Sequence, residues 1–341
     1  MSIPTLFTQL NASVPGIVLG FILVAVLAAC SPVEKPLTVI AHRGASAYLP
    51  EHSLAAKALA HHMNADFIEQ DVVISRDNHA IVFHDLHLEQ VTDVVQRFPN
   101  RARPDGHYYV VDFDLAEIKT LQLVRRINMH GDAVFPSRPE FDQVPFRIST
   151  LDEEITLIQA LNKLSANQAG LYVEIKAPEW HKTEGKDISR LVLAILSQHG
   201  YIERDDNIYL QSFSASELKR IKYELGSQLK LVQLIGDERW DVVLKEHASF
   251  RTPQGLSAIA EYAEGVGVWV KHIVTHRDEK EMLVVSGLVD DAHRAGLSVH
   301  AYTLRKDSLP SYVNNFEELV NTLMQAGVDG VFTDFPDLLK E

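Results

Sequence analysis

The chain has 341 residues, and its 32 Lys and Arg residues against 46 Asp and Glu residues give a formal net charge of −14. Hydrophobic content of 46% and charged content of 23% are typical of a folded globular protein and exclude a wholly disordered chain. The acidic balance argues against a nucleic-acid binder, and a single cysteine, Cys30, excludes a disulfide framework and a cysteine-rich zinc site.

The N-terminal segment predicts an export signal that ends at a lipid anchor. Residues 14–29 carry no charge and end in small residues, which is typical of a secretory signal. The last residues of this run and the cysteine that follows (LAAC) resemble the lipobox of bacterial lipoproteins, which implies cleavage before Cys30 and lipid attachment to its sulfur. An uncleaved anchor is the alternative, and residues 1–15 lack the Lys or Arg that usually begins such a signal.

These features divide the chain into three expected parts. Residues 1–29 are expected to be a lipoprotein signal peptide, residues 30–36 a lipidated tether, and residues 37–341 the folded domain. Ser31 after the cysteine fits sorting to the outer membrane, by analogy with other lipoproteins. We therefore expect a periplasmic protein that is held to a membrane through its lipid.

Short β-branched runs alternate with amphipathic stretches after the anchor. The expected strands are Leu37–Ala41, Asp66–Ile74, Leu171–Ile175, Asn207–Phe213, Lys230–Ile235, Val266–Val270, Ser298–Leu304 and Gly330–Asp334. The expected helices include Leu54–Met63, Asp152–Leu164, Ile188–His199, Ala215–Leu225 and Asn315–Gln325. Apolar strands separated by helices predict a parallel sheet covered on both faces, and eight strands predict a closed (β/α)₈ barrel of the TIM type. A doubly wound open sheet is the alternative.

Two segments interrupt the repeat. Ala80–Phe83 is strand-like but lies too close to Ile74 for a parallel crossover, so it predicts an antiparallel hairpin. A two-residue turn at 77–78 would set Asp71 directly opposite His84.

The second interruption, residues 86–147, is rich in Pro, Arg, Asp and Tyr and shows no clear strand–helix repeat. A segment of roughly sixty residues between barrel elements is usually functional or a small subdomain. It predicts an insertion over the barrel mouth, with a mobile surface excursion as the alternative.

Residues with proton-transfer chemistry fall at the ends of predicted strands. His42 and Arg43 close the first strand, at the edge where barrel enzymes build their active sites, and the hairpin would return His84 to the level of Asp71. Two histidines beside cations can transfer protons at both ends of a bound phosphoryl group. No Ser-His-Asp nucleophile elbow and no glycine-rich phosphate loop occurs, which disfavours acyl transfer and nucleotide hydrolysis.

Carboxylates are placed to bind a hard divalent cation. Glu69 and Asp71 project from one face of a strand, and Glu174 and Lys176 repeat this spacing on another strand. Three carboxylates form an oxygen-only site, which suits Ca²⁺ or Mg²⁺ better than zinc. A structural ion pair between Lys176 and one carboxylate is the alternative.

Two aromatic residues, Phe213 and Tyr302, end strands and are candidates for the wall of a substrate pocket. Packing in the core is the alternative for both, because aromatic residues are common in strands.

The motifs together resemble the glycerophosphodiester phosphodiesterase family. They are VIAHRGASAYLPEHSL at residues 39–54, then FIEQDV, FHD, YVEIKAP, YLQSF, LVQLI and the final GVFTDFPD, in the expected order and spacing. The likeness runs from about residue 39 to residue 337, includes the insertion, and is strongest to the bacterial periplasmic and lipoprotein branch. Residues 236–251 look short for that branch, and APEWHK is altered after the EIK motif.

This resemblance implies a TIM-type barrel that hydrolyses glycerophosphodiesters, such as glycerophosphocholine or glycerophosphoethanolamine, to an alcohol and sn-glycerol 3-phosphate. The implied roles are acid–base catalysis by His42 and His84, a divalent cation (Ca²⁺, or else Mg²⁺) on Glu69, Asp71 and Glu174, phosphate contacts from Arg43 and Lys176, support from Glu51, and pocket walls from Tyr302 and Phe213. The expected partners are thus a small-molecule substrate and, through Cys30, a membrane. A lipoprotein that binds without turnover and a relative that cleaves intact phospholipids are the competing functions.

Overall fold

The computed structural model describes residues 36–141, 144–240 and 245–340, together with positions 1, 2, 4, 8 and 9. The chain divides into two units, Met1–Lys35 and Pro36–Glu341, and the second contains the fold described below. The predicted lipidation site Cys30 lies outside the described residues. Among the residues that the structure does describe, no helix is long and apolar enough to cross a membrane.

Eight parallel strands form a closed barrel. Their order around it is β1-β11-β10-β7-β6-β5-β4-β2, and pairing of β1 with β2 closes the ring. Their bounds are β1 Thr38–Ala41, β2 Phe67–Ile74, β4 Gly170–Ile175, β5 Ile208–Ser212, β6 Lys230–Ile235, β7 Gly265–Trp269, β10 Ser298–Leu304 and β11 Gly330–Thr333. All eight predicted strands and the (β/α)₈ fold class are confirmed. The open doubly wound sheet is excluded because β1 pairs on both of its edges.

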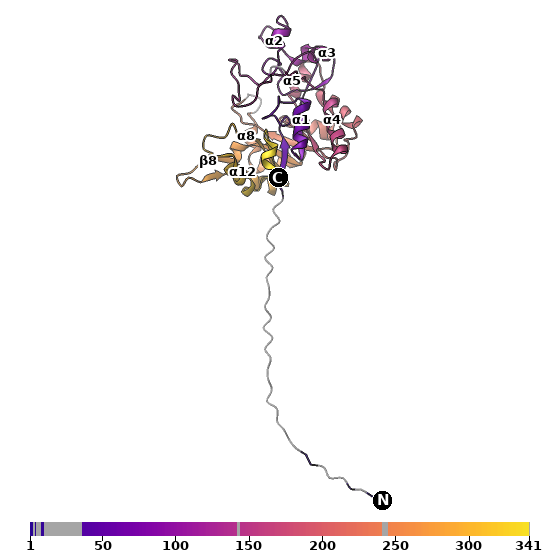
Figure 1. Cartoon of the computed structure of the whole chain (residues 1–341), viewed down its shortest axis with the longest axis vertical. Coiled ribbons are helices and arrows are strands. Elements are labelled where there is room, and N and C mark those ends of the chain that lie inside the picture. The colour runs from indigo at the N-terminus through magenta and orange to yellow at the C-terminus, as the bar shows by residue number, and fades with distance from the viewer. Residues whose placement is uncertain (3, 5–7, 10–35, 142–143, 241–244, 341) are drawn as a thin grey trace. The chain divides into compact units, whose positions relative to one another are not determined.

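Helices surround the barrel, among them α1, α4 and α12 in Figure 1. The longer helices are α1 Leu54–His62, α4 Leu151–Leu164, α6 Ile188–Gln198, α7 Ala215–Tyr223, α9 Pro253–Ala260, α11 Leu288–Arg294 and α12 Phe316–Gln325. Side-chain caps mark the N-termini of several of these helices, and Thr150 caps α4. The Thr150 hydroxyl accepts from the Glu153 N–H, and the Glu153 carboxylate accepts from the Thr150 N–H. Leu151, Ile155 and Ile158 of α4 then face inward and are buried.

Shorter elements complete this unit. They are α5 Pro178–Thr183, α8 His247–Phe250, α10 Val270–Ile273, the antiparallel pair β8 Val274–Arg277 and β9 Leu283–Val285, and the 3₁₀ turn η3 Pro336–Leu339.

The inside of the barrel is a packed core. Ile40, Tyr172, Val232 and Phe332 are buried there. The Tyr172 hydroxyl lies 2.7 Å from Nδ1 of His300, which supplies a partner for each polar group. A filled interior leaves the ends of the strands as the place for a ligand.

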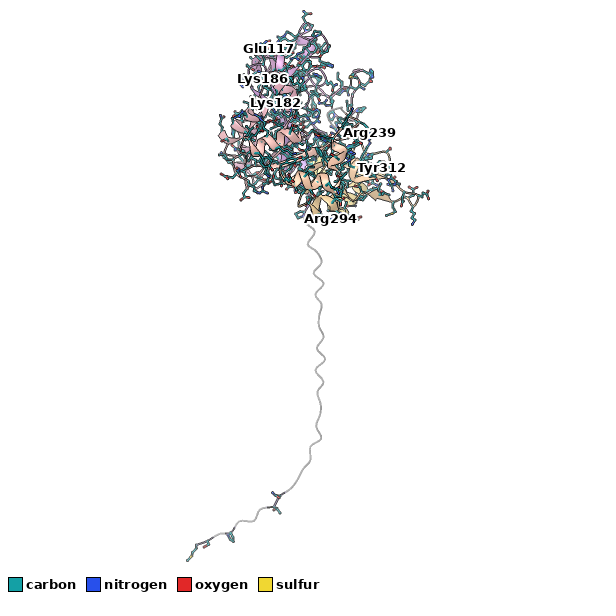
Figure 2. All side chains as sticks on the ribbon, turned by 180° about the vertical axis from the view of Figure 1, so that it is seen from behind. Glu117, Lys182, Lys186, Arg239, Arg294 and Tyr312 are labelled. Atoms are coloured by element: carbon teal, nitrogen blue, oxygen red, sulfur yellow. The ribbon has the colours of Figure 1, made fainter. Side chains whose placement is uncertain are left out.

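The hairpin is present, but its predicted register is wrong by one residue. Strand β3 (Ala80–Val82) pairs antiparallel with β2 so that Val72 faces Val82. The loop has three residues, 76–78, because Asn78 adopts a left-handed conformation with φ of 65°. Lys186, labelled in Figure 2, donates to the Asn78 side chain over 2.7 Å.

One consequence of the three-residue loop is that Asp71 faces Phe83, whose N–H donates to the Asp71 carbonyl over 2.8 Å. His84 therefore follows the position opposite Asp71, where the two-residue turn would have set it directly across.

The segment between β3 and α4 has its own hydrophobic core. It contains α2 Val94–Arg97, η1 Val110–Asp112 and α3 Leu115–Ile118, and α2 and α3 are labelled in Figure 1. Leu88, Val94, Phe113 and other apolar side chains form a buried cluster separate from the main core. Arg126 of this segment donates to Asp85, which follows β3, and Arg138 donates to Asp334 at the end of barrel strand β11.

Candidate active site

A cavity of about 1150 Å³ lies at the ends of the barrel strands. It is lined by the predicted site residues His42, Arg43, Glu69, Asp71, His84, Glu174, Lys176, Phe213 and Tyr302, together with Trp180, Trp240 and Trp269. The structure therefore brings together nine of the residues singled out in the sequence. Glu51 lies outside this lining and contacts it through Arg43.

The turn after β1, which follows His42, holds Arg43 in a strained conformation. Arg43 has φ of 59° and Gly44 has φ of 84°. A side chain at Gly44 would put a Cβ 2.7 Å from the Ala56 carbonyl carbon, so only glycine allows α1 this close approach. The Arg43 N–H donates to Glu69 Oε2 over 2.6 Å, which ties the turn to β2. Strain of this kind gathers at functional sites.

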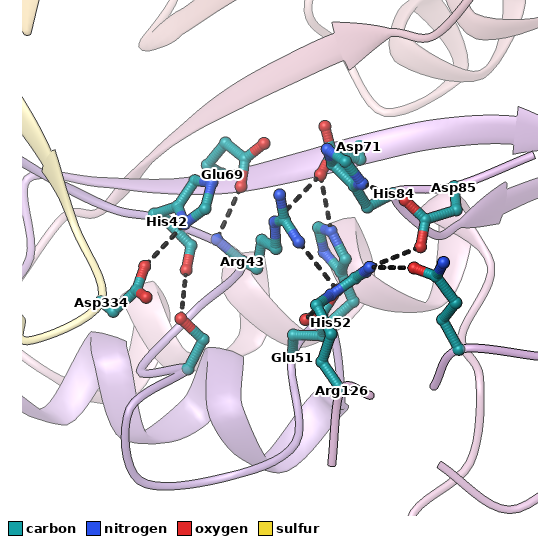
Figure 3. Close-up of polar contacts among 12 residues, drawn as sticks. His42, Arg43, Glu51, His52, Glu69, Asp71, His84, Asp85, Arg126 and Asp334 are labelled. Atoms are coloured by element: carbon teal, nitrogen blue, oxygen red, sulfur yellow. Dashed lines mark hydrogen bonds and ion pairs between the residues drawn. The ribbon is translucent and has the colours of Figure 1, made fainter. Parts of the chain in front are cut away.

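His42 is oriented by a carboxylate from the opposite end of the chain. Its Nδ1 lies 2.6 Å from Oδ1 of Asp334, just after β11 (Figure 3). Burial and the charge of Arg43 lower the pKa of His42 to about 3, although Asp334 acts to raise it. At neutral pH the imidazole is neutral. Because Asp334 accepts the Nδ1 proton, the lone pair of the ring is on Nε2.

His84 has the same arrangement on the other side of Arg43 in Figure 3. Its Nδ1 lies 2.5 Å from Oδ1 of Asp85, and Asp85 in turn accepts from Arg126 Nη1 over 2.6 Å. Burial, Arg43 and Lys176 lower the pKa of His84 to about 4. Two neutral imidazoles therefore border the cavity, each with Nδ1 engaged by a carboxylate.

Three carboxylates line the same cavity as the histidines. Asp71 and Glu174 are direct partners in the register of β2 and β4, and Glu69 projects from the same face as Asp71. Burial and the charge of Asp71 raise the pKa of Glu69 well above its usual value. Burial raises the pKa of Glu174 to about 8. Burial thus disfavours the charged forms of both carboxyl groups, and a cation beside them would favour those forms.

Asp71 is the carboxylate with the most cations close by. Its Oδ1 lies 3.4 Å from Lys176 Nζ, and its Oδ2 lies 3.5 Å from Arg43 Nε. Burial by itself raises the pKa of Asp71, but the charge of Lys176, the hydrogen bond from His52 and the charge of Arg43 act against it, and the pKa lies well below the usual value. Lys176 is also 2.8 Å from Glu174 Oε1, so it pairs with two carboxylates where the alternative from the sequence had it pair with one.

His52 is a site residue that the sequence analysis missed. Its Nε2 lies 2.9 Å from Asp71 Oδ2, and its Nδ1 lies 3.1 Å from Lys57 Nζ. A lysine ammonium can only donate, so Nδ1 accepts and Nε2–H donates to Asp71. His52, Glu69 and Asp71 form a group that could hold a metal ion. Because both ring nitrogens of His52 are engaged, we assign it to orienting Asp71.

Asp334 and Arg126 were also missed as site residues. Two of the three missed residues, His52 and Asp334, could have been found from the sequence. His52 directly follows Glu51, and Asp334 ends a predicted strand at the same edge as His42. Arg126 carried no such signal, because it lies in the segment without a recognisable repeat.

The remaining predicted residues have mainly structural contacts. Glu51 accepts from Arg43 over 2.9 Å and from Arg126 over 2.7 Å. The Tyr302 hydroxyl donates to the Ile235 carbonyl over 2.8 Å, and its ring reaches both the barrel core and the cavity. Phe213 borders the cavity with its ring 6.0 Å from Lys176 Nζ.

Comparison with known proteins agrees with this architecture. Residues 42–338 match the Glycerophosphoryl diester phosphodiesterase family. The chain is 38% identical to the glycerophosphodiester phosphodiesterase of Haemophilus influenzae, covering 94% of this chain and 95% of that protein. It is 36% identical to the glycerophosphodiester phosphodiesterase of Treponema pallidum, covering 94% of each.

Solved structures of similar fold include two of particular interest. A putative glycerophosphoryl diester phosphodiesterase from Silicibacter pomeroyi aligns with a TM-score of 0.67 at 21% identity, covering 89% of this chain and 92% of that one. An Oleispira antarctica phosphodiesterase in complex with the product sn-glycerol-3-phosphate aligns with a TM-score of 0.55 at 23% identity, covering 89% and 95%. At these identities the likeness shows the shared barrel fold.

Proposed function

The chain belongs to the glycerophosphoryl diester phosphodiesterase family and is a glycerophosphodiester phosphodiesterase, and we propose that it releases sn-glycerol 3-phosphate and an alcohol by acid–base catalysis with two histidines. The observation that carries this proposal is the pair of imidazoles, His42 and His84, each held through Nδ1 by a carboxylate at the rim of one cavity. The product named in the Oleispira antarctica complex supports the choice of substrate.

The cations of the site fit a phosphodiester anion. Arg43 and Lys176 line the same cavity as the two histidines, so they are placed to contact the non-bridging phosphate oxygens. Their charge also stabilises the negative charge that grows on these oxygens as the new P–O bond forms.

Proton transfer then needs one base and one acid. Nε2 of one imidazole removes the proton of the nucleophile, either the neighbouring glycerol hydroxyl or a water, as its oxygen attacks phosphorus. The second imidazole donates its Nε2 proton to the alcohol oxygen as the old P–O bond breaks. Attack by water gives sn-glycerol 3-phosphate directly, whereas attack by the glycerol hydroxyl gives a cyclic phosphate, whose ring a water then opens with the two imidazoles in reversed roles. Both histidines are neutral in the free protein, so the acid must gain its proton together with the anionic substrate, whose charge offsets Arg43 and Lys176.

A hard divalent cation fits the carboxylate cluster. Oδ1 of Asp71 is buried and lacks a hydrogen-bond partner among the described residues, and the pKa values of Glu69 and Glu174 are raised by burial. We propose that Glu69, Asp71 and Glu174 hold Ca²⁺ or Mg²⁺, for which oxygen ligands are preferred. A bound cation would supply positive charge beside the reacting phosphoryl group.

A panel of substrates tests the proposed activity. The purified chain is incubated with glycerophosphocholine, glycerophosphoethanolamine and an intact phospholipid, with and without Ca²⁺, and sn-glycerol 3-phosphate is measured by a coupled assay. Release from the two water-soluble diesters is expected. Binding of these diesters without any release would instead favour a binding protein, and choline release from intact lipid alone would favour a phospholipase.

We also propose that the protein is exported and anchored by a lipid on Cys30. The LAAC motif alone supports this proposal. Metabolic labelling with radioactive palmitate and fractionation of the periplasm test this. Label and membrane association are expected in the wild type and should both be lost in Cys30→Ser. An unlabelled wild-type chain of full length would contradict cleavage and lipidation.

A further inference from the structure

A short antiparallel ribbon in the insertion carries two histidines and a glutamate on one face. His87 pairs with Tyr109, and the Leu88 N–H donates to the Tyr108 carbonyl over 2.9 Å. Continuing this register places Glu89 opposite His107. Because side chains alternate across a strand, the side chains of 87, 89 and 107 project from the same face.

These three side chains are in direct contact. The rings of His87 and His107 stack with their centroids 4.2 Å apart and 10° between their planes. Nδ1 of His107 lies 2.6 Å from Oε1 of Glu89. One possible ligand atom from each residue lies within 4.8 Å of the others. The His107 side chain is 41% exposed, so the group is open to solvent.

We propose that His87, Glu89 and His107 form a second metal site, for a transition ion of the Zn²⁺ type, separate from the carboxylates of the barrel. Two imidazole nitrogens and one carboxylate oxygen, with a water as fourth ligand, are the ligand set of open zinc sites. Ca²⁺ and Mg²⁺ are disfavoured because they select sites made of oxygen.

Binding replaces a hydrogen bond by two bonds to the ion. The proton that His107 Nδ1 shares with Glu89 leaves that atom while the ring keeps a proton on Nε2, so Nδ1 and the Glu89 carboxylate can each donate a lone pair to the ion. Their contact must open from 2.6 Å to about 3.3 Å, the separation of two ligands around a tetrahedral ion with bonds of roughly 2.0–2.1 Å. Oε2 of Glu89 accepts from the Tyr108 N–H over 3.1 Å, which orients the carboxylate.

The ribbon backs onto one wall of the active-site cavity. The Tyr109 ring contacts His87 edge-on at 4.4 Å between centroids and stacks on Trp180 at 5.4 Å with 13° between planes. Trp180 lines the cavity. An ion on the ribbon would thus fix the segment that supports this wall.

Calorimetric titration of ZnCl₂ into the whole protein, in excess Ca²⁺, tests the site. One tight equivalent is expected in the wild type. We expect His87→Ala and His107→Ala to weaken it by at least about tenfold, because even outer partners of a metal ligand contribute that much. His130→Ala, which removes an exposed histidine from the same segment, is the matched control and should bind as the wild type does.

A second variant and a second measurement separate this site from the barrel. Glu69→Gln should keep the zinc equivalent, and crystals soaked in ZnCl₂ should show an anomalous peak between His87, Glu89 and His107. Unchanged zinc affinity in both histidine variants would overturn the proposal. So would loss of the equivalent in Glu69→Gln, or an anomalous peak at the barrel carboxylates alone.

Discussion

Asp334 Oδ1 lies 2.6 Å from Nδ1 of His42, so the last barrel strand orients a side chain at the end of the first. Asp334 also accepts from Arg138 Nη2 over 2.6 Å and from Arg305 Nε over 2.7 Å. Burial alone raises the pKa of Asp334, but Arg305 and His42 outweigh it and hold the pKa well below its usual value. The carboxylate thus stays charged, as an orienter of His42 requires.

The first prediction concerns this carboxylate. Asp334→Asn should keep the shape of the site but lose the charge that favours a protonated His42, so kcat should fall by about 10²-fold, at the low end of an acid–base contribution. Steady-state kinetics measures this. Asp337→Asn, which alters the nearby acceptor of the Tyr48 hydroxyl, is the control. Wild-type turnover in Asp334→Asn would show that His42 needs no charged partner.

The two histidines should be separately essential. His42→Ala and His84→Ala are each expected to lower kcat by about 10²–10⁴-fold, because each removes one proton-transfer step. Circular dichroism should show an unchanged fold. His79→Ala, at the exposed tip of the hairpin, is the matched control. Turnover near the wild-type rate in both variants would refute these roles.

Metal removal should abolish activity. EDTA is expected to stop release of glycerol 3-phosphate, and added Ca²⁺ should restore it. Glu69→Gln should raise the Ca²⁺ concentration needed for half-maximal rate, because one of the three proposed ligands loses its charge. The rate is measured as a function of Ca²⁺. Activity that is indifferent to EDTA would remove the metal from the proposal.

A buried ion pair beneath the site should contribute to stability. Lys57 Nζ lies 3.1 Å from Glu154 Oε2, and both side chains are fully buried. Lys57→Met should lower the free energy of unfolding by about 3–5 kcal/mol, since it leaves Glu154 without its cation. Urea denaturation measures the loss. The double variant Lys57→Met/Glu154→Leu should regain much of it, and a double variant as unstable as the single one would contradict this explanation.

His247 is one of the buried histidines through which stability should depend on pH. This buried imidazole accepts from the Gly236 N–H over 3.0 Å at Nδ1, and burial and Arg251 lower its pKa from 6.5 to about 4. Between these two pKa values the unfolded chain binds more protons, so the free energy of unfolding falls as pH drops through this window.

The size of this effect is on the order of 1–3 kcal/mol, from the difference between the two pKa values. Urea unfolding at several pH values checks it, with His247→Gln expected to flatten the slope, because glutamine keeps an acceptor but does not titrate. An equal slope in His79→Ala is the control. An equal slope in His247→Gln would assign the pH dependence to other groups.

Much of the fold was readable from the sequence because its signals are local. Each barrel strand is a short apolar run, and amphipathic stretches typical of helices lie between most of these runs. Glu69 and Asp71 share a face whatever surrounds them, since side chains alternate along a strand. His42 could be placed at the active rim because barrel sites form where strands end.

The tertiary structure decided what depends on residues that are distant in the chain. His42 and Asp334 are separated by 292 positions, and their contact exists because β1 and β11 are neighbours in the closed barrel. The left-handed conformation of Asn78 set the register of the hairpin, which spacing alone placed one residue away. Burial then lowered the pKa values of His42 and His84, and only packing determines burial.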